Sequence, residues 1–239
     1  MYCIHLALLI YQAFQAIDGR SMYYRSGNDI QNPYWTVDNV KTSQDTDRFI
    51  GNTSISYEIN DFMNLSYRLG LDTYTELNSY GQNKGGVDGQ PLGLLRTRTV
   101  RNTIWNHDLI LSADRNLTES LNLKAILGVN ARRDVFNSDG LESQGQLVFG
   151  VLEHFNFTTP SPQNSFVRVG NSNLAQTFEE NLLGAYLDLT FGYEDWIYVN
   201  LVGRNDWSST LEQENNSLFY PGASVSFVPT SIFDGIQGN

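Results

Sequence analysis

Apolar and polar residues alternate with a period of two over most of the chain from Phe49 onward. The segments 65–73, 121–132, 183–191 and 197–206 each place apolar side chains on one parity and polar or small ones on the other. This spacing puts successive side chains on opposite faces of a β-strand, whereas a helix through the same residues would have no coherent apolar stripe. The pattern therefore predicts strands with one apolar and one polar face.

Seven strands are predicted, and they are long. Their ranges are 49–59, 62–76, 99–113, 120–134, 177–191, 196–208 and 217–228. The third is the least regular, because His107 falls on its apolar face and Ile104 and Ile110 fall on its polar face. Strands of globular proteins are usually only about 5–6 residues long, so the lengths call for a special explanation.

The links between these strands alternate in length. Short links near 58–61, 114–120 and 192–195 separate longer ones at 76–98, 135–176 and 209–217. Every short link then lies at one end of the sheet, which predicts an antiparallel up-and-down meander with unequal ends. The glycine-rich run "GQNKGGVDGQPLG" (81–93) lacks the Gly-Lys-Ser/Thr ending of a phosphate loop, so a flexible surface loop is expected there.

Long two-faced strands with unequal links are typical of a transmembrane β-barrel, which has short periplasmic turns and longer outer loops. Aromatic residues near both strand ends suit the two membrane interfaces. Bacterial barrels have an even number of strands from eight upward, and an open edge in lipid would leave backbone groups unpaired. The fold class expected is all-β, as an incomplete barrel segment of about seven to nine strands. The alternative is a soluble β-sandwich that binds glycans, because half-buried soluble sheets also alternate.

Composition narrows the chemistry. The chain has 26 acidic and 15 basic residues and a formal charge of −11, which argues against nucleic acid as a partner. Its single cysteine, Cys3, excludes an internal disulfide framework. The histidines His5, His107 and His154 are widely separated and show no metal-ligand spacing. No enzyme activity, metal or cofactor is predicted.

The polar faces of the predicted strands carry charges of both signs. They are Glu58, Arg68, Asp72, Lys124, Arg132, Asp188, Arg204 and Asp206. Their spacing follows strand alternation, so we interpret them as a solvated inner wall in which some residues tune selectivity. Aromatic faces with polar neighbours commonly hold sugars. The candidate substrate contacts are therefore Tyr186, Tyr198 and Tyr220, which point inward by parity, and Trp35 in an outer segment.

Three stretches resemble the SusC/RagA family of TonB-dependent outer-membrane transporters. They are "NPYW" (32–35), the strand pair at 47–76, and "GRNDWSSTL" followed by "NSLFYPGASVSFVPTSIF" within 203–233. The resemblance implies a 22-stranded barrel with an N-terminal plug in a Gram-negative outer membrane of Bacteroidetes type. It also implies a SusD-like lipoprotein partner and import of oligosaccharides or peptides with energy relayed by TonB, ExbB and ExbD.

The sequence departs from that family pattern at both ends. It shows no plug domain or TonB-interacting segment, and it stops at "IFDGIQGN" where the family continues through more strands. Residues 1–20 form an apolar segment that is a signal or anchor, a short structural element, or the artificial start of a truncated reading frame, and 21–239 are assigned to a partial barrel domain. The chain is therefore expected to be a fragment in contact with outer-membrane lipid that does not transport alone.

Overall fold

The computed structural model describes residues 14–22, 31–87, 91–161 and 175–231. Its strands are long and run in chain order through one sheet. They are β1 (Val40–Asn60), β2 (Met63–Gln82), β3 (Leu94–Asn116), β4 (Leu121–Gln146), β5 (Phe157–Ser161), β6 (Gln176–Tyr193), β7 (Ile197–Ser208) and β8 (Ser217–Phe227). Within these ranges three short helices accompany them, namely α2 (Pro33–Asn39), η1 (His154–Asn156) and η3 (Pro229–Ser231). None of the helices in the described ranges is long and apolar enough to cross a membrane.

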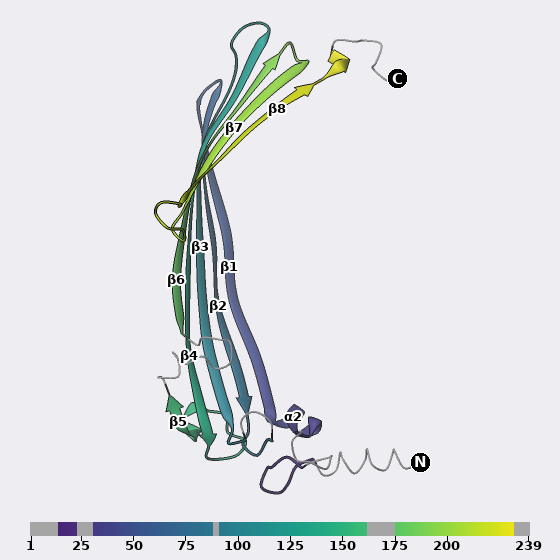
Figure 1. Ribbon diagram of the computed structural model, residues 1–239, viewed down its shortest axis with the longest axis vertical. Coiled ribbons are helices and arrows are strands. Elements are labelled where there is room, and N and C mark those ends of the chain that lie inside the picture. Colours follow the sequence, from purple (N-terminus) through teal and green to yellow (C-terminus); the bar gives the residue numbers. More distant parts are fainter. Residues whose placement is uncertain (1–13, 23–30, 88–90, 162–174, 232–239) are drawn as a thin grey trace, which may run out of the picture. The chain divides into compact units, whose positions relative to one another are not determined.

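The sheet has the order β1-β2-β3-β4-β6-β7-β8, and β5 pairs with β4 beside this path (Figure 1). Each strand on the path neighbours the next along the chain, and the sheet is antiparallel and not closed. The predicted all-β, up-and-down architecture is confirmed, and all seven predicted strands are present. The described strands belong to one sheet, whereas the alternative of a β-sandwich requires two sheets packed face to face.

Four strands extend further than the alternation predicted. β1 begins at Val40, β2 ends at Gln82, β3 begins at Leu94 and β4 ends at Gln146. These extensions include polar runs such as 41–48, which are exposed and are held extended by pairing of β1 with β2 without a regular apolar face. The short strand β5, which pairs Phe157 with Gln146, was not predicted.

The chain divides into two compact units. The first unit comprises Met1–Arg48, Tyr74–Asn102 and Phe136–Thr177, and the second comprises Phe49–Thr73, Thr103–Val135 and Phe178–Asn239. The first unit holds the buried apolar side chains of the described residues. They are Trp35, Leu94, Leu95, Val100 and Phe157.

Helix α2 is fixed in the first unit by its sequence. Asn32 caps the helix by accepting a hydrogen bond at Oδ1 from the Tyr34 backbone N–H, 3.0 Å away, and Pro33 occupies the first turn. The helix buries Trp35 completely, and the indole Nε1 donates to the Gly19 carbonyl at 2.8 Å. A large aromatic side chain with a satisfied N–H is thus the anchor of this segment.

Part of the glycine-rich link 81–93, which was expected to be a flexible surface loop, is buried, namely residues 81–83, 86 and 93. Asn83 is buried, its Nδ2 donates to Asn39 Oδ1 at 3.0 Å, and its Oδ1 accepts from Gln146 Nε2 at 2.8 Å. A Cβ on Gly86 would collide with Gln31 and Gln82. Side-chain amides far apart in sequence hold this link in place, so its glycines serve close packing.

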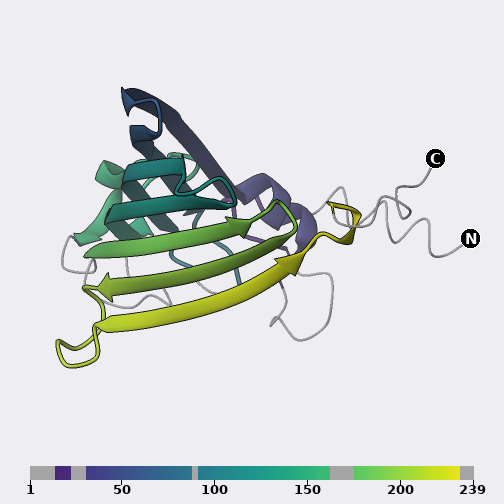
Figure 2. The same ribbon diagram turned by 90° about the horizontal axis from the view of Figure 1, so that it is seen from above.

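In the second unit, β6, β7 and β8 run side by side (Figure 2). Their register places apolar residues of neighbouring strands opposite one another. One face has apolar rows such as Leu189, Leu201 and Ala223 across the three strands. The short link after β6 turns tightly, with Glu194 and Asp195 both at positive φ (47° and 59°). The predicted two-faced strands are thus present here with a fixed register.

Candidate functional site

The polar face of β6, β7 and β8 brings two predicted contact residues together. Tyr186 on β6 lies directly opposite Arg204 on β7, which in turn lies opposite Tyr220 on β8. The Arg204 guanidinium carbon is 5.9 Å from the centre of the Tyr186 ring, within the range of a cation–π interaction. We call these three residues the Tyr-Arg-Tyr row.

Arg204 is held in place by its neighbour two positions on. Its Nε lies 2.8 and 2.9 Å from the two carboxylate oxygens of Asp206, and its Nη2 lies 2.8 Å from Oδ1. Residues i and i+2 of a strand share a face, so the ion pair forms within β7 itself. It orients the guanidinium and neutralises its charge.

Two glycines on neighbouring strands make room for the row. A Cβ at Gly184 would lie 2.6 Å from Asp206 Oδ1 and 2.7 Å from Arg204 Nη2, and a Cβ at Gly128 would overlap the Tyr186 ring. The absence of side chains there lets the ion pair and the ring approach the sheet. The sequence reasoning missed this cluster, although glycines on the polar parity of 121–132 and 183–191 were a visible signal.

A hollow of about 450 Å³ adjoins the row. Its polar lining residues include Asn106, Asn130, Arg132, Ser208 and Asn216. Some of these side chains already have partners, since Asn130 Nδ2 donates to Asp108 at 2.6 Å and Arg132 pairs with Asp134 at 3.1 Å. Aromatic rings beside amides and hydroxyls suit a polar organic ligand.

The other two predicted contacts lie elsewhere. Tyr198 is opposite Gly192 and Ser226, towards the short link after β6, and its ring covers Gly192. Trp35 belongs to the first unit, where it is fully buried. The structure thus groups Tyr186 with Tyr220 but does not place Tyr198 beside them, and Trp35 belongs to the other unit. That the four residues contact substrate stays a prediction.

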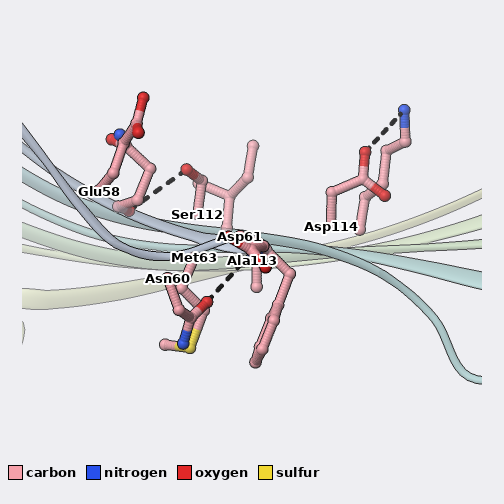
Figure 3. Close-up of a pocket in the computed structure, with 11 residues that line it drawn as sticks. Glu58, Asn60, Asp61, Met63, Ser112, Ala113 and Asp114 are labelled. Carbon is pink, nitrogen blue, oxygen red and sulfur yellow. Dashed lines mark hydrogen bonds and ion pairs between the residues drawn. The ribbon is translucent and has the colours of Figure 1, made fainter.

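A second hollow, of about 640 Å³, lies near the short links of the second unit (Figure 3). Its lining includes Glu58, Asp61 and Asp114, and Asp114 pairs with Lys124 at 3.3 Å and accepts from Asn122 at 2.9 Å. Within the described residues, no three His, Cys, Asp or Glu side chains are close enough together to bind a metal. The hollow therefore contains the ion pair of Asp114 with Lys124 but no grouped metal ligands among the described residues.

Two histidines have structural partners. His107 Nδ1 is 2.8 Å from the Tyr67 hydroxyl, which explains how this polar ring is accommodated on the apolar parity of β3. His154 lies between Thr97 Oγ1 at 2.9 Å and Ser143 Oγ at 2.8 Å, and burial lowers its pKa below the usual 6.5. Ser143 is completely buried, so this pair does not present a nucleophile to a substrate. His5 lies outside the described residues.

Several solved structures are similar to this chain in fold. A structure of the RagAB peptide transporter matches 91% of this chain with a TM-score of 0.76 and 20% sequence identity. The RagAB peptide importer in its open-open state matches with a TM-score of 0.75 and 20% identity over 93% of this chain, and the closed-closed state with 0.73 and 18% over 93%. The sheet has the RagA fold.

The resemblance to SusC/RagA barrels expected from the sequence is confirmed at the level of fold. This chain spans only 24% of the length of each RagAB chain that it matches. No family model matches the sequence, and no curated protein is similar to it by sequence. The described sheet thus corresponds in fold to about a quarter of a RagAB chain.

Proposed function

We propose that this chain forms part of the wall of a TonB-dependent importer in the bacterial outer membrane. The observation that carries the proposal is the match of the whole sheet to RagAB transporter structures, with a TM-score of 0.76. The strand order and the division of faces support it independently, because a barrel wall needs neighbouring antiparallel strands with one apolar and one polar face.

The apolar face of the second unit is suited to lipid. Leu183, Leu201, Phe219 and Val225 share this parity and are between 44% and 69% exposed. Exposed apolar rows of this kind would be an aggregation hazard in water. In a membrane, lipid tails would cover them.

Aromatic rings gather where this face meets the short links. The Trp196 ring is 5.3 Å from Phe227 and 6.4 Å from Tyr193, in edge-to-face arrangements. Aromatic girdles mark both interfaces of outer-membrane barrels. We therefore place the periplasmic interface at this cluster.

The proposed cargo is a peptide or an oligosaccharide, taken up with a SusD-like lipoprotein and with energy from TonB, ExbB and ExbD. The RagAB structures are described as those of a peptide transporter or importer, which supports a peptide first. In this proposal the polar face is lumenal, and Tyr186 and Tyr220 offer ring faces while the fixed Arg204 offers hydrogen bonds.

The experiment has two parts. The protein should fractionate with outer membranes and show heat-modifiable mobility on gels in detergent, as folded barrels do; a fully soluble protein without this shift would contradict the proposal. Binding of a labelled oligopeptide mixture and of labelled maltooligosaccharides by the detergent-extracted protein should then be compared for Y186A/Y220A and for Y57A, which changes an exposed tyrosine on the opposite parity. We expect a several-fold loss only in the first variant.

A further inference from the structure

A polar hollow in the first unit contains an arginine without a carboxylate partner. The hollow measures about 330 Å³ and is bounded by β1, β2 and β3. Its lining includes Thr42, Gln44, Glu76, Tyr80, Arg96 and Arg98. It is separate from the Tyr-Arg-Tyr row, which belongs to the second unit.

The two arginines of this hollow differ in how their charge is balanced. Arg96 donates from Nε to Glu142 Oε2 at 2.9 Å, and its Nη2 lies 2.9 Å from the same oxygen. Glu142 is 1% exposed, and its other oxygen accepts from Gln144 Nε2 at 2.9 Å. This buried ion pair is complete, so Arg96 contributes little net charge to the hollow.

Among the described residues, no carboxylate forms an ion pair with Arg98. Its Nη2 donates to Ser138 Oγ at 3.1 Å, while its Nε is buried and has no hydrogen-bond partner among the described residues. A guanidinium has five N–H donors arranged to match a carboxylate. Leaving a buried charged donor unsatisfied is costly, so a ligand that supplied an acceptor here would recover that loss.

The carboxylate in the lining of this hollow, that of Glu76, already accepts hydrogen bonds from its neighbours. Glu76 accepts at one oxygen from Gln44 Nε2 and at the other from Asn78 Nδ2, both at 2.6 Å, and it makes no ion pair with Arg98 within 4 Å. Its presence also means that a bound molecule should carry hydrogen-bond donors next to its acid group.

We propose that Arg98 binds the carboxylate of a ligand, with the donors of that ligand directed to Glu76. A peptide C-terminus and a uronic acid both have this chemistry. The inference deepens the proposed importer function by assigning a subsite for acidic cargo. It rests on that function only for the meaning of the ligand as cargo, because binding itself requires no transport.

The test is calorimetric titration of the intact protein extracted in detergent. One arm compares N-acetyl-trialanine with its C-terminal amide, and the other compares digalacturonate with its methyl ester. We expect the free acid to bind at least tenfold more tightly than the neutral form in one arm, which identifies the source of the carboxylate. R98Q should remove that preference.

Two variants serve as controls. R101Q changes an arginine on the opposite parity of the same strand, whose distant partner Asp139 is 3.9 Å away, and should leave the preference unchanged. E76Q should keep or strengthen acid binding, since it removes a like charge. Equal loss in R98Q and E76Q, equal binding of acid and neutral forms, or no binding of either acid by the wild type would overturn the inference. Retained binding in a protein that does not fractionate with outer membranes would instead contradict the proposed function alone.

Discussion

The two units of this chain are stabilised in different ways. The first unit buries Trp35 and four other large apolar residues together with hydrogen-bonded amides and a carboxylate. In the described part of the second unit, the buried residues are three glycines, Gly128, Gly184 and Gly192, each beneath a neighbouring side chain. The first unit therefore has a core of its own, whereas the second depends on its backbone ladder and on whatever covers its faces.

The largest expected difference between the two units concerns the replacement of one tryptophan by alanine in each. W35A removes a completely buried ring and the hydrogen bond to Gly19, and should destabilise the first unit by about 3–5 kcal/mol. W207A removes a ring that is 36% exposed on the apolar face of the second unit, and should cost much less in detergent. Hydrogen exchange in each unit measures both effects. Similar losses of stability in the two variants would mean that the buried Trp35 stabilises the first unit no more than the half-exposed Trp207 stabilises the second.

A second test compares one ion pair from each unit. E142Q leaves Arg96 without its charge partner in a buried setting, and we expect a loss of about 3 kcal/mol. D206N breaks a pair whose side chains are 42% and 34% exposed, where water can replace the lost contact, so a loss below about 1 kcal/mol is expected. Denaturant titration of both variants in detergent provides the measurement. A larger loss of stability in D206N than in E142Q would contradict the proposed difference between the two units.

The same difference explains how much of the fold the sequence could reveal. A wall with one apolar and one polar face must alternate with period two, because a shift of one residue exchanges the faces; the strands of the second unit were therefore visible in segments such as 121–132. The extension 41–48 carries no such alternation, and β5 is short. Pairing with a neighbouring strand determines these parts, so a local pattern could not predict them.

The candidate site was predictable only in part for a related reason. Parity placed Tyr186 and Tyr220 on one face, but only the register of three strands shows that Arg204 lies between them. The burial of Trp35 depends on contacts with residues far away in sequence, such as Gly19. The parity of a residue within its strand predicts the face on which it lies. Its neighbours on that face depend on the register with adjacent strands, which the sequence of one strand does not determine.

A smaller, pH-dependent effect should be confined to the first unit. Burial lowers the pKa of His154, and the nearby Glu153 carboxylate opposes this more weakly. The unfolded chain then binds a proton more readily than the folded one, so stability is present above about pH 6.5 and is lost as the pH falls through 6.5 towards the folded pKa. The protection factors of amides around β5, which correct for the slower intrinsic exchange at lower pH, should fall between pH 7.5 and 5.5, and H154Q should remove this dependence. An equal fall in the second unit would argue for a general acid effect.

The smallest effect concerns the turn between β6 and β7, where the second unit is strained. Glu194 and Asp195 both adopt positive φ, which costs a non-glycine residue roughly 1–2 kcal/mol. D195G should relieve that strain but adds about 0.5–1 kcal/mol of unfolded-state entropy, leaving a gain of about 0.5 kcal/mol. D61G, in the β1–β2 link where φ is not positive, should instead be destabilising by the entropy alone. Because the second unit lacks a core, such ladder and turn contributions should decide its stability, and urea titration of the two variants in detergent should show opposite signs. If both glycines shift the midpoint in the same direction, the turn is not where the second unit stores its strain.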